Sequence, residues 1–219
     1  MKKIKIVGVG SGGNNAVNYM LESNIKGVDF IAVDGDRHSL KKSRTDNKIS
    51  IDPGFRGLGQ VLAEEFAQEA RKRDEEIVKA IDGADIVFII AGMGGEVGTG
   101  ASPVIAEIAK ELGALTVSVV TMPSFVESEL RARRAKEGVD KLKNFSDELF
   151  VLYLNDILSE RSKIEIWDMQ NYSATPIVVP VSKETNSSVM DAFKRADNAM
   201  CFCVQCLISR YTNLDEKPI

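Results

Sequence analysis

The amino-acid sequence predicts a doubly wound α/β fold, in which helices cover both faces of a mostly parallel sheet. Short apolar segments alternate with longer amphipathic ones along nearly the whole chain, and this alternation is typical of parallel strands joined by crossover helices. Residues 84–91 are apolar almost without interruption, as expected of a strand buried on both faces of a sheet. Two glycine-rich turns each link a predicted strand to a predicted helix. Both turns are therefore expected at the carboxyl edge of the sheet, where such folds bind ligands.

The first half of the chain predicts two strands and two helices. Residues 3–9 form a short apolar run that predicts the first strand, and residues 28–33 predict the second. Apolar residues recur at helical spacing between them, and residues 60–81 predict one long charged helix with an apolar side. The apolar positions are Val17, Met20 and Leu21 in the first helix and Leu62, Phe66, Ala70, Ile77 and Ile81 in the second.

The second half continues the alternation, apart from residues 161–185. That segment includes an extended run with two prolines, at 175–181, and predicts a hairpin-like excursion. No linker or internal repeat is evident, so we expect a single domain over residues 1–209, with an irregular insertion at 159–185. Strands are predicted at 84–91, 114–121 and 149–154, and helices up to about residue 112, at 127–144 and at 189–209.

Composition and charge exclude several classes of protein. A chain with 44% hydrophobic and 27% charged residues is typical of soluble globular proteins and not of disordered ones. The formal net charge of -4 argues against a nucleic-acid partner held by bulk charge. No apolar run approaches the roughly 20 residues of a membrane span, and the apolar stretch at the start is too short for a signal peptide. We therefore expect a cytoplasmic protein without direct membrane contact.

The three cysteines lie close together, at Cys201, Cys203 and Cys206, and the chain has one histidine, His38. This odd, clustered set does not predict a disulfide framework and favours a reducing compartment. In a helix that turns by about 100° per residue, Cys201 lies away from the other two thiols. We therefore expect no metal site and instead thiols buried on a helix.

The first glycine turn, residues 8–13, has the pattern Gly8-x-Gly10-x-x-Gly13 between a strand and a helix. Glycines permit a tight turn and let backbone N–H groups approach a phosphate, which the helix N-terminus also favours. Asp34 ends the second strand, where the acid of a Rossmann-like domain binds a ribose hydroxyl. Taken alone, these features would suggest an NAD(P)-dependent oxidoreductase.

The second glycine turn, residues 91–100, has the sequence AGMGGEVGTG and again joins a strand to a helix. Two such turns at one edge of a sheet suit a ligand with several phosphates, because each offers backbone N–H groups. The alternative is that the glycines only permit close packing of helix on strand. One glycine would suffice for that purpose, whereas this turn has five.

Eight short segments carry a resemblance to a known family. They are IVGVG at 6–10, GVDFIAV at 27–33, RGLG at 56–59, GADIVF at 83–88, GMGG at 92–95, GTGA at 98–101, PVIAEIAK at 103–110 and LTVSVVT at 115–121. With them the chain resembles FtsZ, the bacterial homologue of tubulin, which is a GTPase that polymerises at the division site. The resemblance covers about residues 1–158 and 189–215 and implies a Rossmann-like sheet of the tubulin/FtsZ GTPase-domain type.

The resemblance implies that GTP or GDP binds between the two glycine turns, with Mg²⁺ as an optional companion of GTP. Glu127 would bind the ribose and Arg131 a phosphate, and their spacing of four residues places them on one helix face; a plain surface ion pair is the alternative. Asn155 and Asp197 would read the guanine edge. Phe193 would stack on the base, unless it is a core aromatic. The implied phosphate-binding residues are Gly10, Ser11, Gly12, Gly13 and Asn15 in the first turn and Gly92, Met93, Gly94, Gly95, Gly98, Thr99 and Gly100 in the second.

Several positions depart from the family pattern where the phosphates are expected. Glu96 and Val97 stand in the second turn where the family has glycine and threonine, which introduces a carboxylate and removes a hydroxyl donor. Asn14 replaces a glycine and Asp34 replaces an asparagine. Residues 60–65 continue a helical pattern where the family has a loop that senses the terminal phosphate.

Catalysis in the family depends on a synergy loop, which completes the active site of the next subunit. Asn213 and Asp215 match this loop and would act in trans, whereas Pro218 stands where a second aspartate is expected. A proline offers no carboxylate to an attacking water. Residues 210–219 are therefore expected to be a remnant of the synergy loop, with the family's second domain absent.

These observations predict an FtsZ-like guanine-nucleotide-binding protein with weakened GTP hydrolysis, linked to cell division or to cytoskeletal filament assembly. Its partners would be the nucleotide and either a second copy of the chain or a filament of full-length FtsZ. A non-enzymatic structural paralogue that modulates a full-length FtsZ is the alternative, which Glu96 and Val97 favour. A remote alternative is the NAD(P)-dependent oxidoreductase, which Asp34 would suit.

Overall fold

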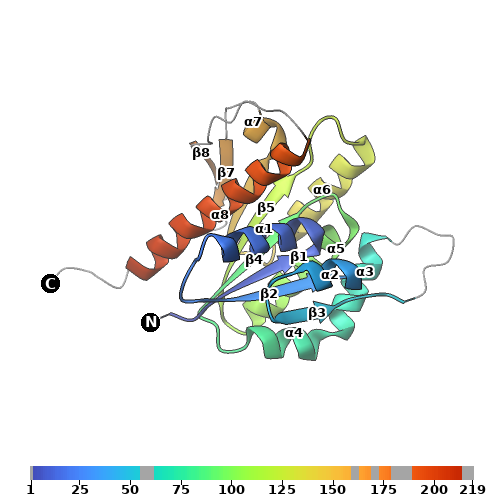
Figure 1. Cartoon of the computed structure of the whole chain (residues 1–219), viewed down its shortest axis with the longest axis vertical. Helices are drawn as coiled ribbons and strands as arrows, with labels where there is room; N and C mark the ends of the chain where they lie inside the picture. Colours follow the sequence, from blue (N-terminus) through green and yellow to red (C-terminus); the bar gives the residue numbers. More distant parts are fainter. Residues whose placement is uncertain (1, 55–61, 159–162, 169–172, 179–188, 214–219) are drawn as a thin grey trace.

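The structure is a computed structural model that describes residues 2–54, 62–158, 163–168, 173–178 and 189–213. Within them, eight strands form one sheet in the order β3-β2-β1-β4-β5-β6-β7-β8 (Figure 1). The pairs from β3 to β6 are parallel, and β7 and β8 add an antiparallel hairpin at one edge. The strands are β1 (Ile4–Val9), β2 (Val28–Asp34), β3 (Asn47–Ser50), β4 (Ile86–Gly92), β5 (Leu115–Met122), β6 (Glu148–Tyr153), β7 (Lys163–Asp168) and β8 (Ser173–Val178).

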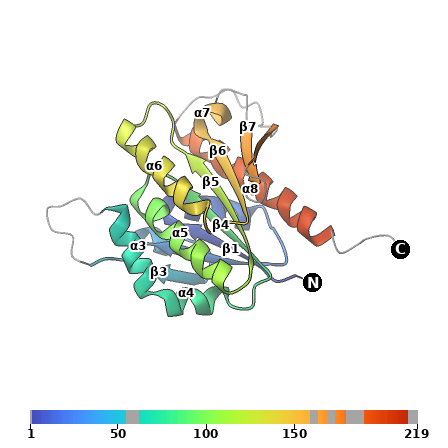
Figure 2. The same cartoon turned by 180° about the vertical axis from the view of Figure 1, so that it is seen from behind.

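Helices cover both faces of the sheet, as the sequence predicts. Helices α1 and α8 lie on one face (Figure 1), and α3, α4, α5 and α6 lie on the other (Figure 2). None of the helices in the described segments is both long and apolar enough to cross a membrane. The helices are α1 (Gly10–Glu22), α2 (Arg37–Lys42), α3 (Ala63–Lys72), α4 (Asp74–Ile81), α5 (Glu96–Glu111), α6 (Glu129–Leu142), α7 (Leu154–Leu158) and α8 (Val189–Asn213).

Strand β4 is buried on both faces of the sheet, as predicted for residues 84–91. Val87 and Ile89 pack in the cluster that lies under α3 to α6. Phe88 and Ile90, which alternate with them along the strand, pack in the cluster under α1 and α8. Because successive side chains of a strand point to opposite faces, an uninterrupted apolar run supplies both cores at once.

The long helix expected at residues 60–81 is wrong in two respects. Two helices, α3 and α4, replace it, and the chain leaves helical geometry at Arg73, whose φ is -109°. Basic residues end α3 and acidic residues begin α4, an arrangement that stabilises two separate helix ends through their dipoles. Leu62, expected to be buried, is 50% exposed, whereas the four other apolar positions are buried as predicted. Residues 60 and 61 lie outside the described segments.

Other differences concern short elements and element ends. Helix α2, strand β3 and helix α7 were not expected, because segments of four to six residues are too short to show a period. Strands β7 and β8 form the hairpin expected within residues 161–185. Helix α8 extends to residue 213 and contains all three thiols, two of which, Cys201 and Cys203, are buried while Cys206 is exposed.

Candidate functional site

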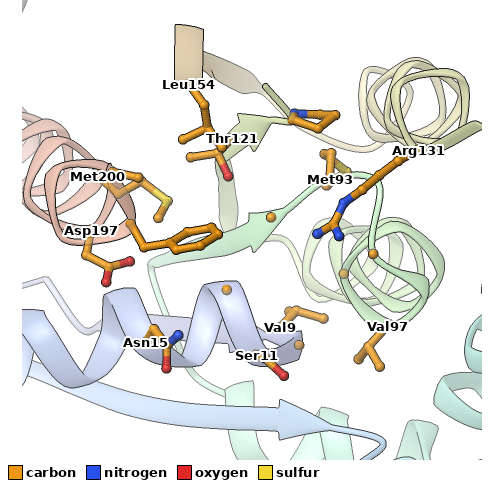
Figure 3. Close-up of a pocket in the computed structure, with 18 of the residues that line it drawn as sticks. Val9, Ser11, Asn15, Met93, Val97, Thr121, Arg131, Leu154, Asp197 and Met200 are labelled. Atoms are coloured by element: carbon orange, nitrogen blue, oxygen red, sulfur yellow. The ribbon is translucent and has the colours of Figure 1, made fainter. Parts of the chain in front are cut away.

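A cavity of about 270 Å³ opens at the carboxyl ends of β1 and β4. The strand order reverses between these two strands, and ligands of doubly wound sheets bind at such a point. Side chains from α1, α5, α6 and α8 surround the cavity (Figure 3). The lining residues are Val9, Gly10, Ser11, Gly12, Asn15, Gly92, Met93, Gly95, Glu96, Val97, Gly98, Thr121, Pro123, Glu127, Arg131, Leu154, Phe193, Ala196, Asp197 and Met200.

The glycines of the first turn have different reasons to be glycine. Gly10 begins α1 with φ of +70°, a backbone conformation that side chains disfavour. A Cβ on Gly13 would collide with the carbonyl oxygen of Ile90, so this glycine permits α1 to pack closely on β4, and Gly13 does not line the cavity. A Cβ on Gly12 would meet nothing closer than 3.5 Å. The packing of the protein therefore does not require glycine at position 12, which lines the cavity.

The glycines of the second turn also fall into two groups, those that the packing requires and those that it does not. Gly94 has φ of +93°, and Cβ atoms on Gly98 and Gly100 would run into the carbonyl oxygens of Gly92 and Ala63. For these three the packing explanation holds, and Gly94 and Gly100 do not line the cavity. Cβ atoms on Gly92 and Gly95 would meet nothing closer than 3.6 Å and 3.9 Å. Gly12, Gly92 and Gly95 thus form a cradle that bound phosphates can fill through close approach of the backbone.

Thr99 is buried, does not line the cavity and stabilises the second turn through a hydrogen bond. Its Oγ1 accepts a hydrogen bond of 2.8 Å from the backbone N–H of Gly94, and its side chain is buried. The bond fixes the loop ahead of α5, so Thr99 acts on the cavity through the backbone of the turn.

Helix α8 supplies one end of the cavity. Phe193 and Asp197 lie one helical turn apart and both line it, together with Ala196 and Met200. Phe193 is an exposed large apolar side chain, so it is not a core aromatic. Burial of the carboxyl group raises the pKa of Asp197 to about 7.

The opposite side of the cavity is formed by α5 and α6, and Figure 3 places Arg131 and Val97 across from Asp197 and Met200. Arg131 Nε lies 2.9 Å from Glu127 Oε2. Glu127 also accepts a hydrogen bond of 2.8 Å through Oε1 from the N–H of Ser124. Glu127 and Arg131 therefore form the ion pair that was the alternative to a nucleotide-binding role. Both side chains nevertheless line the cavity.

Asn155 does not reach the cavity. Its Oδ1 accepts hydrogen bonds of 2.9 Å from Ser124 Oγ and 3.0 Å from the N–H of Phe125. These bonds hold the loop between β5 and α6, which carries Glu127. In this structure Asn155 therefore positions the loop.

Three of the departures from the family pattern, Asn14, Asp34 and Glu96, have side-chain partners in the structure. Asn14 Nδ2 donates a hydrogen bond of 3.2 Å to Asp34 Oδ2, and Ser11 Oγ lies 3.4 Å from the same oxygen. Asp34 is 1% exposed and does not line the cavity. Glu96 Oε1 accepts a hydrogen bond of 3.2 Å from Arg134 Nη1, so the unexpected carboxylate has a counter-ion.

Several lining residues were not expected from the sequence. Thr121 and Pro123 lie at the carboxyl end of β5, and Leu154 follows that of β6, where the rule for parallel sheets would have found them. Ala196 and Met200 lie three and seven residues after Phe193, a spacing that places them on its helix face.

Some sequence-based candidates cannot be placed. The segment 56–59, residue Asp215 and Pro218 lie outside the described residues, and Asn213 is described only as the last residue of α8. Within the described residues no group of three His, Cys, Asp or Glu side chains can hold a metal ion.

Comparison with known proteins agrees with this geometry. The family model described as "Tubulin/FtsZ family, GTPase domain" matches residues 3–162. The cell division protein FtsZ of Mycoplasmopsis pulmonis is 44% identical over 158 residues, which are 72% of this chain and 40% of that protein. The chain thus spans less than half of the length of this relative.

Solved structures give the same result. An empty FtsZ dimer from M. jannaschii has a TM-score of 0.78 at 33% identity and covers 95% of this chain, which spans 55% of that one. CetZ2 of Haloferax volcanii, in a GTPγS-bound protofilament, has a TM-score of 0.71 at 17% identity, with 94% of this chain and 57% of that chain covered; this likeness shows the fold alone. The matching family model, the identity to FtsZ and the structural match to FtsZ together place the chain in the tubulin/FtsZ family.

Proposed function

We propose that the cavity binds a guanine nucleotide and that binding is coupled to association with filaments of the FtsZ type. The observation that carries this proposal is the cradle of Gly12, Gly92 and Gly95, which the packing of the protein does not require. It lies in a cavity that has an aromatic ring and a carboxylate at one end, Phe193 and Asp197. A base, a ribose and phosphates can follow one another along such a site.

Each part of the nucleotide has a matching group. Asp197 would accept hydrogen bonds from the N–H groups of guanine, which adenine does not present in the same places, and Phe193 would cover the face of the base. Glu127 would bind the ribose hydroxyls, and Arg131 would bind phosphate with the N–H groups of both turns. Mg²⁺ would enter with GTP and neutralise phosphate charge.

Exposed apolar side chains next to the cavity support association with a partner. Phe125 and Val126 are 80% and 77% exposed and precede Glu127 directly in the loop that borders the site. Large apolar side chains exposed together mark interaction surfaces. A partner that covers this loop would also cover the nucleotide, which would couple binding to assembly and link the protein to cell division.

Thermal denaturation with guanosine, GDP, GTP, ATP and NAD side by side tests the proposal. A ligand at 100 times its Kd should stabilise the protein by about 2.7 kcal/mol, and guanine nucleotides should do so at lower concentration than ATP or NAD. Asp197→Ala should remove the preference for guanine. Equal shifts with GTP and ATP would contradict the assignment of the base end.

A non-enzymatic role is the second candidate, and the Glu96–Arg134 pair favours it because a carboxylate stands near the expected phosphates. Phosphate release and light scattering, measured alone and during titration into polymerising FtsZ, separate the two functions. Altered assembly of FtsZ without any phosphate release by this chain supports the modulator. An NAD(P) site is less favoured, because Asp34 is buried beneath the first turn and does not line the cavity.

A further inference from the structure

The side of the cavity farther from the base end contains a carboxylate with its own counter-ion. Glu96 lines the cavity and is the first residue of α5. Its partner Arg134 comes from α6, with N–O separation of 3.2 Å and side-chain exposures of 19% for the arginine and 41% for the glutamate. The ion pair therefore fixes the carboxylate at the edge of the cavity.

Glu96 places negative charge where a helix attracts an anion. The first turn of an α-helix carries free N–H groups and partial positive charge, which stabilise either an acidic side chain or a bound phosphate. In this chain the acidic side chain is already present. A phosphate that entered the same space would meet a like charge in a partly buried site, where screening is weaker than in water.

The length of a nucleotide decides whether it reaches this carboxylate. Asp197 and Met200 lie on one side of the cavity, and Val97, the neighbour of Glu96, lies on the other (Figure 3). A nucleotide that is held by its base near Phe193 extends its phosphates toward Glu96, and each added phosphate brings more negative charge closer. The third phosphate would therefore feel the largest repulsion.

We propose that Glu96 and Arg134 set the number of phosphates that the site accepts, so that it prefers guanosine diphosphate to the triphosphate. This inference rests on the proposed binding of guanine nucleotides in the cavity. The Glu96 carboxylate occupies the helix N-terminus and repels the third phosphate. Arg134 is a positioning residue, since it acts by holding the Glu96 carboxylate at the N-terminus of α5.

Calorimetric titration of guanosine, GDP and GTP in EDTA tests the proposal. The wild-type chain should bind GDP about tenfold more tightly than GTP, which corresponds to about 1.4 kcal/mol. Glu96→Gln removes the charge at nearly constant volume and should tighten GTP binding by about tenfold with little change for GDP. Arg134→Gln leaves the carboxylate without its counter-ion and should widen the difference, whereas the double variant should behave like Glu96→Gln.

A matched control comes from the same helix. Glu107 lies on α5, pairs with Arg71 at 2.6 Å and does not line the cavity. Glu107→Gln makes the same change in net charge and should leave both affinities unaltered. Melting temperatures of all variants verify that each is folded, which the partial exposure of Glu96 and Glu107 favours.

The outcomes separate this inference from the proposed function. Equal affinities for GDP and GTP in the wild-type chain overturn the inference while the proposed function stands. No binding of guanosine or GDP by the wild type or by Glu96→Gln overturns the proposed function itself. Titrations repeated with Mg²⁺ test whether Glu96 is instead a metal ligand. If Mg²⁺ makes GTP the tighter ligand and Glu96→Gln abolishes that gain, Glu96 binds the metal and the inference is wrong.

Discussion

Guanosine binding should become stronger as the pH rises, because Asp197 must be ionised to accept hydrogen bonds from the base. Burial raises the pKa of this carboxyl group to about 7 in the ligand-free protein. With that pKa, about a tenth of the molecules carry the carboxylate at pH 6 and about nine tenths at pH 8, and the apparent Kd scales inversely with this fraction. The affinity should therefore increase about tenfold over these two pH units, equivalent to about 1.4 kcal/mol.

Calorimetry with guanosine measures this effect without interference from phosphate groups, which titrate near pH 6 themselves. In two buffers with different heats of ionisation, binding near pH 7 should release about half a proton per guanosine, since half of the Asp197 side chains must ionise. Asp197→Asn cannot ionise. It should bind more weakly at pH 8 and show no dependence on pH.

The same pKa makes an opposite prediction for stability. The folded-state pKa of Asp197 lies above the unfolded value of 3.8, so the folded state binds more protons, and this group lowers the free energy of unfolding as the pH rises from about 4 to about 7. Ligand-free Asp197→Asn should consequently unfold at a higher temperature than the wild type at pH 8. A wild-type affinity that stays constant between pH 6 and 8, with the protein folded throughout, would refute the assignment of Asp197 as the base-reading carboxylate.

Three further predictions concern separate parts of the site. Gly12→Ala should keep or raise the melting temperature and weaken GDP binding about tenfold, because its Cβ meets the protein only at ordinary contact distance but lies at the cavity, whereas Gly13→Ala should lower stability by about 2 kcal/mol through its clash with a strand carbonyl. In urea denaturation, Asn14→Gly combined with Asp34→Ala should cost about 1 kcal/mol less than the sum of the single changes, because either change alone breaks their shared hydrogen bond; exact additivity would deny the coupling. Phe125→Ser should weaken self-association or co-assembly in sedimentation without altering guanosine affinity, since the ring is 80% exposed; unchanged sedimentation would remove this side chain from the contact surface.

The layered fold follows from the sequence because it depends on local patterns. Residues 84–91 are apolar except for Asp85, and this property alone predicts the central strand β4. The break at Arg73 was missed for a related reason: Phe66, Ala70, Ile77 and Ile81 keep one helical period across it. The charges that separate α3 from α4 are local as well, but they carry no periodic signal.

The candidate site is less predictable, because its important contacts join residues that are far apart in the chain. The two glycine turns and Asp197 can be found from motifs and resemblance. The partner of Glu96 is 38 residues away on another helix, and no spacing rule connects them. Similarly, the sequence could not distinguish Gly12 from Gly13, since the difference depends on whether a strand carbonyl lies behind the helix.

The hydrogen bond between Asn14 and Asp34 has an evolutionary consequence. Both side chains are nearly inaccessible to water, so a lineage that replaced only Asp34 with an apolar residue would leave the Asn14 amide with the carbonyl oxygen of Val33 as its remaining acceptor, at a cost of about 1–3 kcal/mol. An ancestor with glycine at position 14 would have had no donor there to offer a new carboxylate at position 34. The two substitutions are thus epistatic, and close relatives of this chain should carry both or neither.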